Sequence, residues 1–342
     1  MPRYLGFDTT PERLVTAKTA VLLVNLGTPA APTTDAVRDY LAEFLSDPRI
    51  VELPRWLWWP ILHGYILRTR PARSAEAYAK IWRNDGSPLL VFGERLKDAV
   101  RARIDRVMPG NAEVALAMTY GEPSVAAAIE SLMARGVRRL LVFPLFPQYS
   151  ATSTGAAIDA VTRTLQTLRW PPELRTIGDY HTDAGYLAAL VGSVQAHWAQ
   201  HGRGEKLLLS FHGIPEKYAK AGDPYPDQCR ETARRLGDAL GLADDEWLVA
   251  FQSRLGRQPW LRPYTDETIE QLARQDVATL DVVCPGFAVD CLETLEEIAL
   301  RYRATFLTNG GKQFHYIPAL NDGSAHASAL ADMAVKQLAG WI

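Results

Sequence analysis

The stretch Thr19-Ala-Val-Leu-Leu-Val-Asn-Leu-Gly-Thr-Pro29 is an apolar run that ends in a small polar turn. Its apolar residues do not alternate with polar ones, which is typical of a parallel strand covered by helices on both faces. A similar pattern returns at Leu207-Leu-Leu-Ser-Phe-His-Gly-Ile-Pro215. A strand and turn of this kind, occurring twice, predict two similar α/β halves.

Short apolar runs alternate with amphipathic segments of helical length along the whole chain, as in proteins built from βα units. Strands are predicted at 19–26, 112–118, 138–143, 174–177, 206–210, 247–251, 279–284 and 313–317. Helices are predicted at 35–45, 89–107, 124–135, 187–200, 228–240, 290–301 and 325–341. The strands fit one large sheet or two sheets of four, and the polar segment 201–206, which contains glycines, favours two.

We therefore expect an α/β fold with two Rossmann-like lobes, each with a four-stranded parallel sheet flanked by helices. In this interpretation, residues 1–172 form the N-terminal lobe and residues 173–342 form the C-terminal lobe. The C-terminal helix is amphipathic and suited to pack on either lobe.

Composition argues against several classes of function. The 342 residues carry 37 basic and 39 acidic side chains, a balance that does not favour nucleic-acid binding over a broad basic face. Three cysteines without a CxxC pair fit a reducing compartment. The first 20 residues lack the apolar region of a signal peptide, and no apolar run could span a membrane, so we expect a cytoplasmic protein. No Walker A, GxGxxG or GxSxG pattern indicates nucleotide binding or serine hydrolysis.

His212 is the first candidate for chemistry, because ligands of open α/β sheets bind beyond the carboxyl ends of the strands. It follows the apolar run of the fifth strand directly and precedes Gly213, so its side chain should project from a fixed backbone. An imidazole, with a pKa of about 6.5, can accept a proton or bind a divalent metal. The alternative is a histidine that only caps a turn.

Three acids, Asp290, Glu293 and Glu297, lie at spacings i, i+3 and i+7 and would share one face of a helix. Acidic residues are favoured in the first turn of any helix, which is sufficient to explain Asp290 and Glu293. It does not explain the third acid. A row of carboxylates that enters a cleft is suited to carry protons or a hard cation.

Aromatic residues near strand ends could line a flat apolar pocket, although aromatic residues are more often part of a core. The members of this group are Tyr149, Trp260 and Phe287, together with the earlier Tyr78.

The segment Trp56–Leu67, called the lip below, holds three tryptophans within four residues. We expect it to be an exposed helix at a ligand mouth or a membrane surface. The flanking Arg55, Arg68 and Arg70 could meet carboxylates or lipid phosphates.

Seven stretches occur in the order of a known enzyme family: VLLVNLGTP (21–29), GSPL (86–89), VFPLFPQYSATSTG (142–155), LSFHGIP (209–215), AGDPYPDQC (221–229), FQSRLGRQPWLRPYTDETI (251–269) and VVCPGFAVDCLETLEEI (282–298). On these stretches the chain resembles the ferrochelatases over nearly its full length. With the closing IPALN (317–321), it is most similar to the forms in Gram-negative bacteria.

The resemblance implies two Rossmann-like lobes with a porphyrin cleft between them. It implies insertion of Fe²⁺ into protoporphyrin IX with release of two protons, the terminal step of haem biosynthesis, without a redox or nucleotide cofactor. His212 matches the family's histidine and Glu293 its paired acid, both for catalysis and metal binding, and Asp290 and Glu297 are expected to form a proton or cation relay. The residues expected to bind the porphyrin are Asn25, Tyr78, Ser87, Tyr149, Trp260 and Phe287.

The chain departs from many family members at three positions. Thr119 stands where an arginine is common, Cys291 where a histidine is common, and Arg301 where some members extend the acid row. Some ferrochelatases bind an iron–sulfur cluster through cysteines in a C-terminal extension. No cysteine follows Cys291, so no cluster is expected here.

Two other interpretations compete with a ferrochelatase. A related chelatase that loads cobalt or nickel into another tetrapyrrole would be expected to have more histidines at its metal site. A non-catalytic porphyrin or haem carrier would need an axial ligand but no proton relay. In either case the lip predicts peripheral contact with the inner face of a membrane, and the sequence leaves the oligomeric state open.

Overall fold

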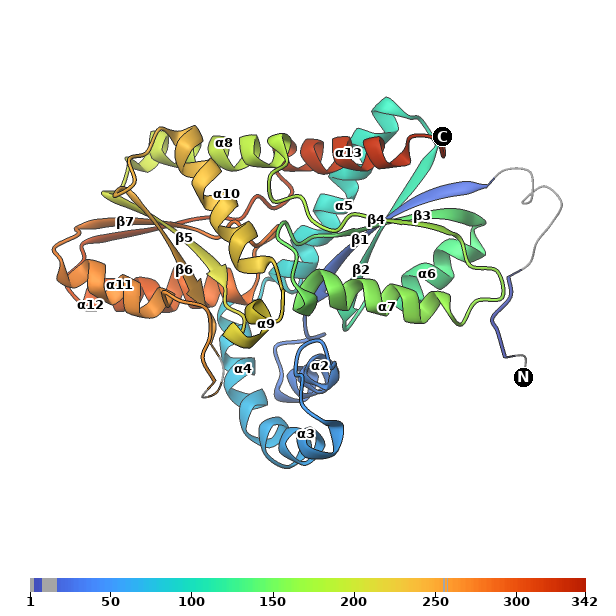
Figure 1. The fold of residues 1–342 in the computed structure, drawn as a ribbon, viewed down its shortest axis with the longest axis horizontal. Helices are drawn as coiled ribbons and strands as arrows, with labels where there is room; N and C mark the ends of the chain where they lie inside the picture. The colour runs from blue at the N-terminus through green and yellow to red at the C-terminus, as the bar shows by residue number, and fades with distance from the viewer. Residues whose placement is uncertain (1–2, 8–16, 255, 257) are drawn as a thin grey trace. The chain divides into compact units, whose positions relative to one another are not determined.

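A computed structural model describes residues 3–7, 17–254, 256 and 258–342 of the chain. Residues 1–2 and 8–16 of the N-terminal segment considered above lie outside this description. Within the described residues, eight strands form two separate four-stranded sheets, and the strand pairs are parallel (Figure 1). The predicted α/β class with two parallel sheets of four strands is confirmed.

The first sheet has the strand order β2-β1-β3-β4. Its strands are β1 (Lys18–Gly27), β2 (Ala112–Tyr120), β3 (Val137–Pro144) and β4 (Glu173–Thr176). Residues 20–24 of β1 are completely buried, because the strand lies inside the sheet and under helices, which explains its unbroken apolar sequence. Helix α5 (Pro88–Val107) packs on one face of the sheet, and α6 (Val125–Ala134) and α7 (Ala156–Leu165) pack on the other. The short π-helix η2 (Ala151–Gly155) leads into α7.

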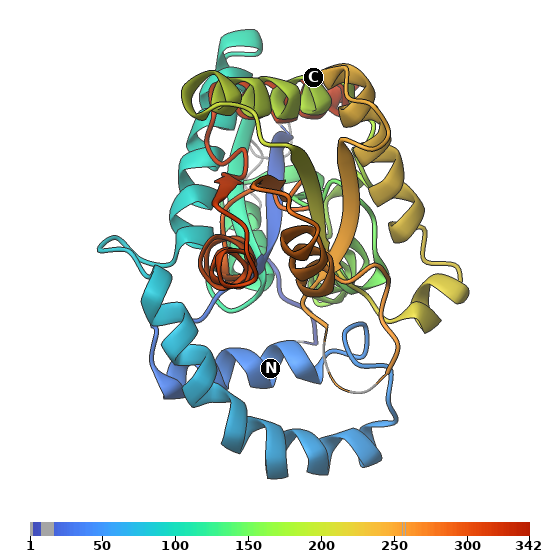
Figure 2. The same ribbon diagram turned by 90° about the vertical axis from the view of Figure 1, so that its left-hand side faces the viewer.

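A helical group stands beside the first sheet and carries the lip. It consists of α2 (Thr34–Ser46), α3 (Arg55–Ile61), the π-helix η1 (Leu62–Ile66) and α4 (Leu67–Ile81), drawn in blue in Figures 1 and 2. Its buried centre is formed by Leu45, Leu62 and Leu67.

The second sheet has the equivalent order, β6-β5-β7-β8. Its strands are β5 (Lys206–His212), β6 (Trp247–Gln252), β7 (Thr279–Val283) and β8 (Gln313–Ile317). Its helices are α8 (Ala184–His201) and α10 (Tyr225–Leu240) on one face, and α11 (Thr265–Arg274), the π-helix η3 (Glu293–Tyr302) and α12 (Arg303–Thr308) on the other. The short helix α9 (Glu216–Lys220) follows β5.

The chain divides into two compact units whose boundary differs from the expected one at residues 172 and 173. The first unit contains the described residues of Met1–Leu145, Ala151–Asp179 and Ala327–Ile342, and the second contains Phe146–Ser150 and Tyr180–His326. The expected boundary placed 173–176 in the wrong half, because β4 pairs with β3 and completes the edge of the first sheet. Most of the C-terminal helix α13 (Ser324–Leu338) belongs to the first unit, where Arg175 of β4 donates to Ala339 O.

Candidate active site

His212 is the last residue of β5, where the sequence places it, and its side chain is half-buried. It pairs in register with Gln252, the last residue of β6. Its Nδ1 lies 2.7 Å from Gly213 O, and Gly213 N donates to Gln252 O at 2.8 Å. The imidazole therefore projects from a backbone that is fixed on both sides.

Trp260 lies directly beside this strand end. Leu261 N donates to Ile214 O at 3.0 Å, and a Cβ built on Gly213 would lie 3.3 Å from the Trp260 ring and 2.9 Å from Gln252 O. Only a glycine after His212 lets the tryptophan and the β6 backbone approach so closely. The close packing of Trp260 on the residue that follows His212 brings these two predicted site residues together.

Gln252 connects His212 to the acidic segment, and the sequence analysis did not select it. It is almost completely buried, its Nε2 donates to Glu293 O at 2.9 Å, and its Oε1 accepts a hydrogen bond from Ser210 Oγ at 2.7 Å. A glutamine at a strand end was a visible signal, but its role depends on a contact with a residue 41 positions later in the chain.

The predicted α-helix 290–301 is wrong in type and in its first residue. Glu293–Tyr302 form the π-helix η3, and Leu292 caps it, so Asp290 precedes the helix. A π-helix has hydrogen bonds from i to i+5 and is wider than an α-helix, so the i, i+3, i+7 face predicted for the three acids does not apply. The acids lie in three different environments.

Glu293 is partly exposed, whereas Glu297 is buried among hydrogen-bond donors. Tyr302 Oη donates to Glu297 Oε1 at 2.7 Å, Ser253 Oγ donates to Oε2, and Arg301 Nη2 lies 3.1 Å from Oε1. Burial and the Glu297 carboxylate raise the pKa of Tyr302, so its hydroxyl stays a donor. Arg301, at the position where some members have another acid, is half-exposed and pairs with this buried carboxylate.

Asp290 is 3% exposed and holds the loop that follows β8. Its Oδ1 accepts from Tyr316 Oη at 2.5 Å and from Thr294 Oγ1 at 2.9 Å, and its Oδ2 accepts from Asn321 Nδ2 at 2.8 Å. In return, Asp290 N donates to Asn321 Oδ1 at 2.8 Å. Both carboxylate oxygens therefore serve local structure.

The three cysteines are buried and free. Burial raises the pKa of each thiol, and the Glu293 carboxylate beside Cys291 raises the pKa of that thiol further. A neutral buried thiol is a poor nucleophile, so the three cysteines are suited to packing in the core.

Tyr149 and Phe287 lie on neighbouring loops of the second unit. The residues beside them touch, because a Cβ built on Gly286 would lie 3.4 Å from Gln148 Oε1. Tyr149 N donates to Gln228 Oε1 at 2.6 Å, and Phe287 packs on the core cluster that contains Leu208 and Val282. Both aromatic side chains are half-buried.

The predicted porphyrin residues of the first unit are buried in its interior. Asn25 and Ser87 are both buried. Ser87 Oγ lies 2.7 Å from Thr28 Oγ1, and Asn25 O accepts a hydrogen bond from Thr119 Oγ1 at 3.1 Å. The threonine that replaces the common arginine thus fastens β2 to the end of β1. Tyr78 is 8% exposed and packs edge-on against Trp82.

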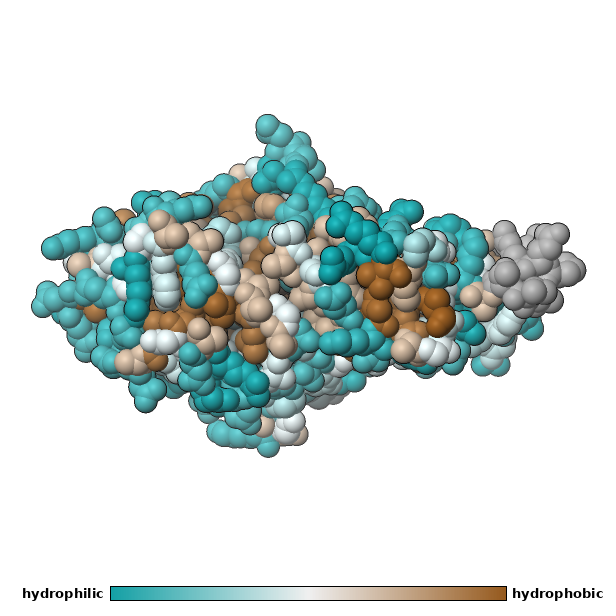
Figure 3. Space-filling model, turned by 90° about the horizontal axis from the view of Figure 1, so that it is seen from above, coloured by the Kyte–Doolittle hydropathy of each residue, from teal (hydrophilic) through white to brown (hydrophobic). Residues whose placement is uncertain are grey.

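The lip exposes a group of large apolar side chains, as expected, but one of its three tryptophans is turned inward. Trp56 is 78% exposed, Tyr65 67% and Trp59 47%. Trp58, in contrast, points inward and donates from Nε1 to Leu45 O at 2.7 Å, because a helix turns successive residues to different faces. On the face drawn in Figure 3, hydrophobic residues form only small groups among hydrophilic ones.

None of the helices among the described residues has the length and apolar composition needed to cross a membrane.

Comparisons with known proteins agree on one family. The ferrochelatase family model matches residues 18–338. The chain is 54% identical to the ferrochelatase of Thioalkalivibrio sulfidiphilus, over 94% of this chain and 87% of that protein, and 52% identical to that of Neisseria gonorrhoeae, over 95% of both.

Solved structures of low sequence identity share the fold. SirB from Bacillus subtilis with Fe³⁺ matches with a TM-score of 0.56 at 12% identity, over 95% of this chain and 97% of that one. The sirohydrochlorin chelatase SirB from Bacillus subtilis subspecies spizizenii in complex with cobalt matches with a TM-score of 0.52 at 13% identity, over 92% and 93%. The sequence relatives go further than this likeness of fold: the chain belongs to the ferrochelatase family, and it is an enzyme that inserts Fe²⁺ into protoporphyrin in haem biosynthesis.

Proposed function

We propose that His212 is the principal base and iron contact of this ferrochelatase and that Glu293 is its paired acid. Insertion of Fe²⁺ into protoporphyrin IX replaces two pyrrole protons, so the site must accept protons while the ion loses water ligands. The assignment rests mainly on the contacts of Gln252. This residue is the register partner of His212, and its Nε2 donates to Glu293 O at 2.9 Å. One buried side chain thereby ties the two residues to a common frame.

The hydrogen bond at Nδ1 supports a base role for His212. A carbonyl oxygen only accepts, so the neutral imidazole donates from Nδ1 to Gly213 O and keeps its lone pair on Nε2. Nε2 is the atom that we assign to take a pyrrole proton or to bind the ion. A single nitrogen cannot do both at once, and the partly exposed Glu293 supplies the second acceptor.

Glu297 is proposed to relay protons or the cation between Glu293 and the surface. Its carboxylate contacts Gln252 on one side, at 3.5 Å, and the half-exposed Arg301 on the other. The hydroxyls of Ser253 and Tyr302, which bond its two oxygens, offer exchangeable protons along this path.

Asp290 was expected to belong to the relay, and its contacts favour a different role. Four donors, from Thr294, Tyr316, Ala319 and Asn321, occupy its oxygens. We propose that Asp290 positions the segment that leads into η3, and so Glu293, without handling protons itself.

The porphyrin is proposed to contact the aromatic side chains Tyr149, Trp260 and Phe287 of the second unit and Asn25, Tyr78 and Ser87 of the first. A planar apolar macrocycle is best matched by flat aromatic walls with a few polar groups, and its burial contributes about 25 cal/mol per Å². Trp260 is the strongest of these assignments, because its ring packs on the residue next to His212.

We assign Fe²⁺ the role of substrate and propose that no iron–sulfur cluster is resident. Such a cluster needs several thiolate ligands, whereas burial holds all three thiols in their neutral form by raising their pKa. The absorption spectrum of the purified protein tests this, because an iron–sulfur band would contradict it.

The site assignment is tested by anaerobic metal insertion, followed by absorbance, with protoporphyrin IX and Fe²⁺. Wild type should form metalloporphyrin, and His212→Ala should lose it while still binding porphyrin, as measured by quenching of porphyrin fluorescence. Turnover that survives in His212→Ala would keep the enzyme and refute the assigned base. Binding without turnover in wild type would indicate a porphyrin carrier.

The lip is proposed to make peripheral contact with the inner face of the cytoplasmic membrane, where a poorly soluble substrate resides. Trp56, Trp59 and Tyr65 place aromatic rings at one surface, and such rings favour the membrane interface. Arg55, whose guanidinium lies 5.5 Å from the Trp59 ring centre, places a positive charge beside them for anionic headgroups.

Flotation with vesicles that contain phosphatidylglycerol tests the membrane contact. The double variant Trp56→Glu, Trp59→Glu should lose flotation, while Trp170→Glu should keep it, because Trp170 is 48% exposed but lies outside the lip. Equal flotation of the two variants, or none in wild type, would refute the proposal.

A further inference from the structure

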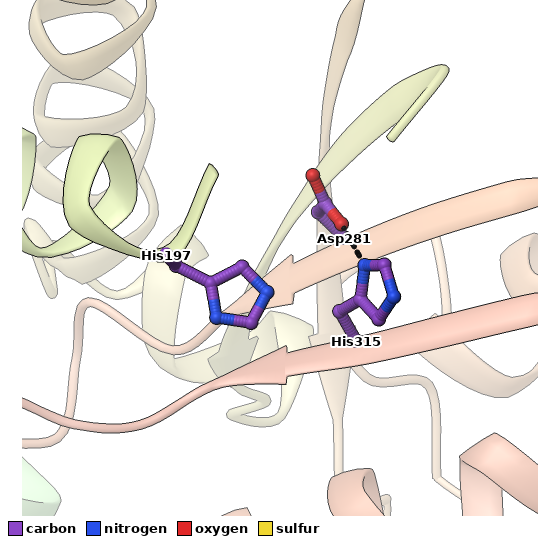
Figure 4. Close-up of side chains that lie close together, drawn as sticks. All are labelled: His197, Asp281 and His315. Carbon is purple, nitrogen blue, oxygen red and sulfur yellow. Dashed lines mark hydrogen bonds and ion pairs between the residues drawn. The ribbon is translucent and has the colours of Figure 1, made fainter. Parts of the chain in front are cut away.

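A second group of potential metal ligands lies in the second unit, away from the strand ends. His197 of α8, Asp281 of β7 and His315 of β8 bring ligand atoms within 4.8 Å of one another, and Figure 4 shows their side chains close together. Asp281 and His315 are register partners, so they project from the same face of the sheet. Their neighbours Val282 and Tyr316 face the opposite side, where Tyr316 bonds Asp290. The group is therefore separate from the acids of the candidate active site.

Asp281 is a fixed anion at the base of this group. It is completely buried, its Oδ2 accepts from Trp198 Nε1 at 2.6 Å and from Gly204 N at 2.8 Å, and its Oδ1 lies 2.9 Å from His315 Nδ1. A Cβ on Gly204 would lie 2.8 Å from Asp281 Cγ, so the backbone is shaped to reach this carboxylate. A carboxylate that bonds one imidazole nitrogen, leaving the other for a metal, is the usual support of a histidine ligand.

A third imidazole, that of His201, lies close to the rings of His197 and His315. His197 and His201 are one helical turn apart on α8, and their ring centres lie 4.6 Å apart. The His315 ring centre is 5.4 Å from that of His197 and 6.0 Å from that of His201. Imidazoles on one tetrahedral ion have ring centres about 5 Å apart, since each centre lies about 3 Å from the ion.

His197 carries a nitrogen that lacks a protein partner. Its Nε2 is buried and makes no hydrogen bond in the described part of the chain, which costs free energy unless a ligand or ion is bound. Burial lowers the pKa of His197, the Asp281 carboxylate opposes this shift, and the neighbouring His201 and His315 lower the pKa further. The neutral imidazole is the form that binds metals.

We propose that His197, His201 and His315 form a zinc-type metal site that fastens α8 to β7 and β8, with Asp281 positioning His315. Imidazole is a borderline ligand that favours Zn²⁺, Co²⁺ and Ni²⁺ over Mg²⁺ and Ca²⁺. The inference does not rest on the role proposed for His212, because neither the residues nor the sheet face are shared.

Calorimetric titration of the porphyrin-free protein with Zn²⁺ tests the site, with Mg²⁺ as a comparison. Wild type should bind one equivalent that does not depend on His212 and that also raises the melting temperature of the protein. His197→Ala and His201→Ala should each weaken that equivalent by about tenfold or more, without disturbing the Asp281–His315 pair. Asp281→Asn is not used first, because its side chain is completely buried and its loss could prevent folding.

Two controls separate this site from the candidate active site. His63→Ala removes another histidine, in η1, and His212→Ala removes the proposed iron contact; both should keep the Zn²⁺ equivalent and the shift in melting temperature. Visible absorption of bound Co²⁺ should show a tetrahedral nitrogen-ligated ion in wild type and lose intensity in His197→Ala. Zn²⁺ binding that is unchanged in His197→Ala and His201→Ala, or that disappears in His212→Ala, would overturn the proposal.

Discussion

The two units share one strand order but carry different chemistry at the end of their first strand. The orders are β2-β1-β3-β4 and β6-β5-β7-β8. Strand β1 ends in Leu26-Gly27, whereas β5 ends in His212 and is followed by Gly213. A Cβ on Gly27 would lie 1.8 Å from Tyr120 O, and one on Gly213 would lie 2.9 Å from Gln252 O. Both units have a glycine at this position, because a side chain there would collide with the neighbouring strand. The residue before the glycine is an apolar leucine in the first unit and a histidine in the second.

The surroundings of the two strand ends differ in the same way. At β1 the polar contacts are neutral, since Thr28 bonds Ser87 and Thr119 bonds Asn25 O. At β5 the contacts lead through Gln252 to the backbone carbonyl of Glu293 and to the Glu297 carboxylate. The same backbone thus carries neutral polar contacts in one unit and contacts that lead to an acidic segment in the other. The following predictions test the proposal that the first serve as a wall for the porphyrin and that the second handle protons.

The largest effect is expected for Glu293→Gln. An amide cannot accept a pyrrole proton, so iron insertion should fall by about 10²–10⁴-fold while porphyrin binding stays unchanged. The measurement is the anaerobic rate of metalloporphyrin formation. Glu270→Gln on α11, where Glu270 pairs with Arg274 at the surface, is the matched control and should keep the rate. Full turnover in Glu293→Gln would remove the carboxylate from the proposed chemistry.

The glycines that the two units share should differ in tolerance. Gly27→Ala meets a backbone oxygen and a φ of 121°, so we expect a loss of about 4 kcal/mol in the free energy of unfolding. Gly213→Ala meets Gln252 O and the Trp260 ring at longer distances and should cost about 1–3 kcal/mol. Urea unfolding measures both. If the Gly27→Ala protein were as stable as wild type, the predicted collision with Tyr120 O would be refuted.

The sequence predicted the strands well, because parallel strands covered on both faces are unbroken apolar runs. All eight predicted strands are present, with ends that move by one or two residues. Asp290 was misplaced because nothing in the local pattern distinguishes a π-helix from an α-helix, and the difference depends on packing.

Contacts between distant segments could not be derived from spacing. Gln252 and Glu293 lie 41 positions apart, and His197, Asp281 and His315 come from three elements of the fold. The boundary between the units was missed for the same reason, because only the pairing of β4 with β3 assigns 173–176 to the first sheet.

A third prediction concerns the titration of His326, which lies in the second unit. Burial lowers the pKa of His326 to about 4, so the folded protein keeps it neutral while the unfolded chain takes up a proton below about pH 6.5. The neutral state of His326 therefore contributes about 3 kcal/mol to the free energy of unfolding above pH 6.5. This contribution is lost as the pH falls toward 4. Urea unfolding at several pH values should show this slope in wild type and a flatter one in His326→Gln. Equal slopes would contradict it.

The smallest effects are expected when one side-chain hydrogen bond is removed from each unit. Tyr302→Phe removes a donor from the buried Glu297 carboxylate and should cost about 1.5–3 kcal/mol, because bonds to charged groups are the stronger kind. Ser87→Ala removes the hydroxyl that forms a hydrogen bond with Thr28 Oγ1, and it should lower the free energy of unfolding by about 0.5–1.5 kcal/mol. Urea unfolding of both variants gives the stability difference, and the insertion assay gives a second readout.

In that assay, the relay proposed for Glu297 predicts a lower kcat for Tyr302→Phe, because the phenol supplies one of its exchangeable protons. Ser87→Ala should change KM for porphyrin and leave kcat unaltered, since a neutral wall binds the macrocycle but moves no proton. If Tyr302→Phe lost stability but kept its kcat, Glu297 would hold Gln252 in place without carrying protons. The proton-handling groups proposed for the second unit would then be reduced to the pair His212 and Glu293.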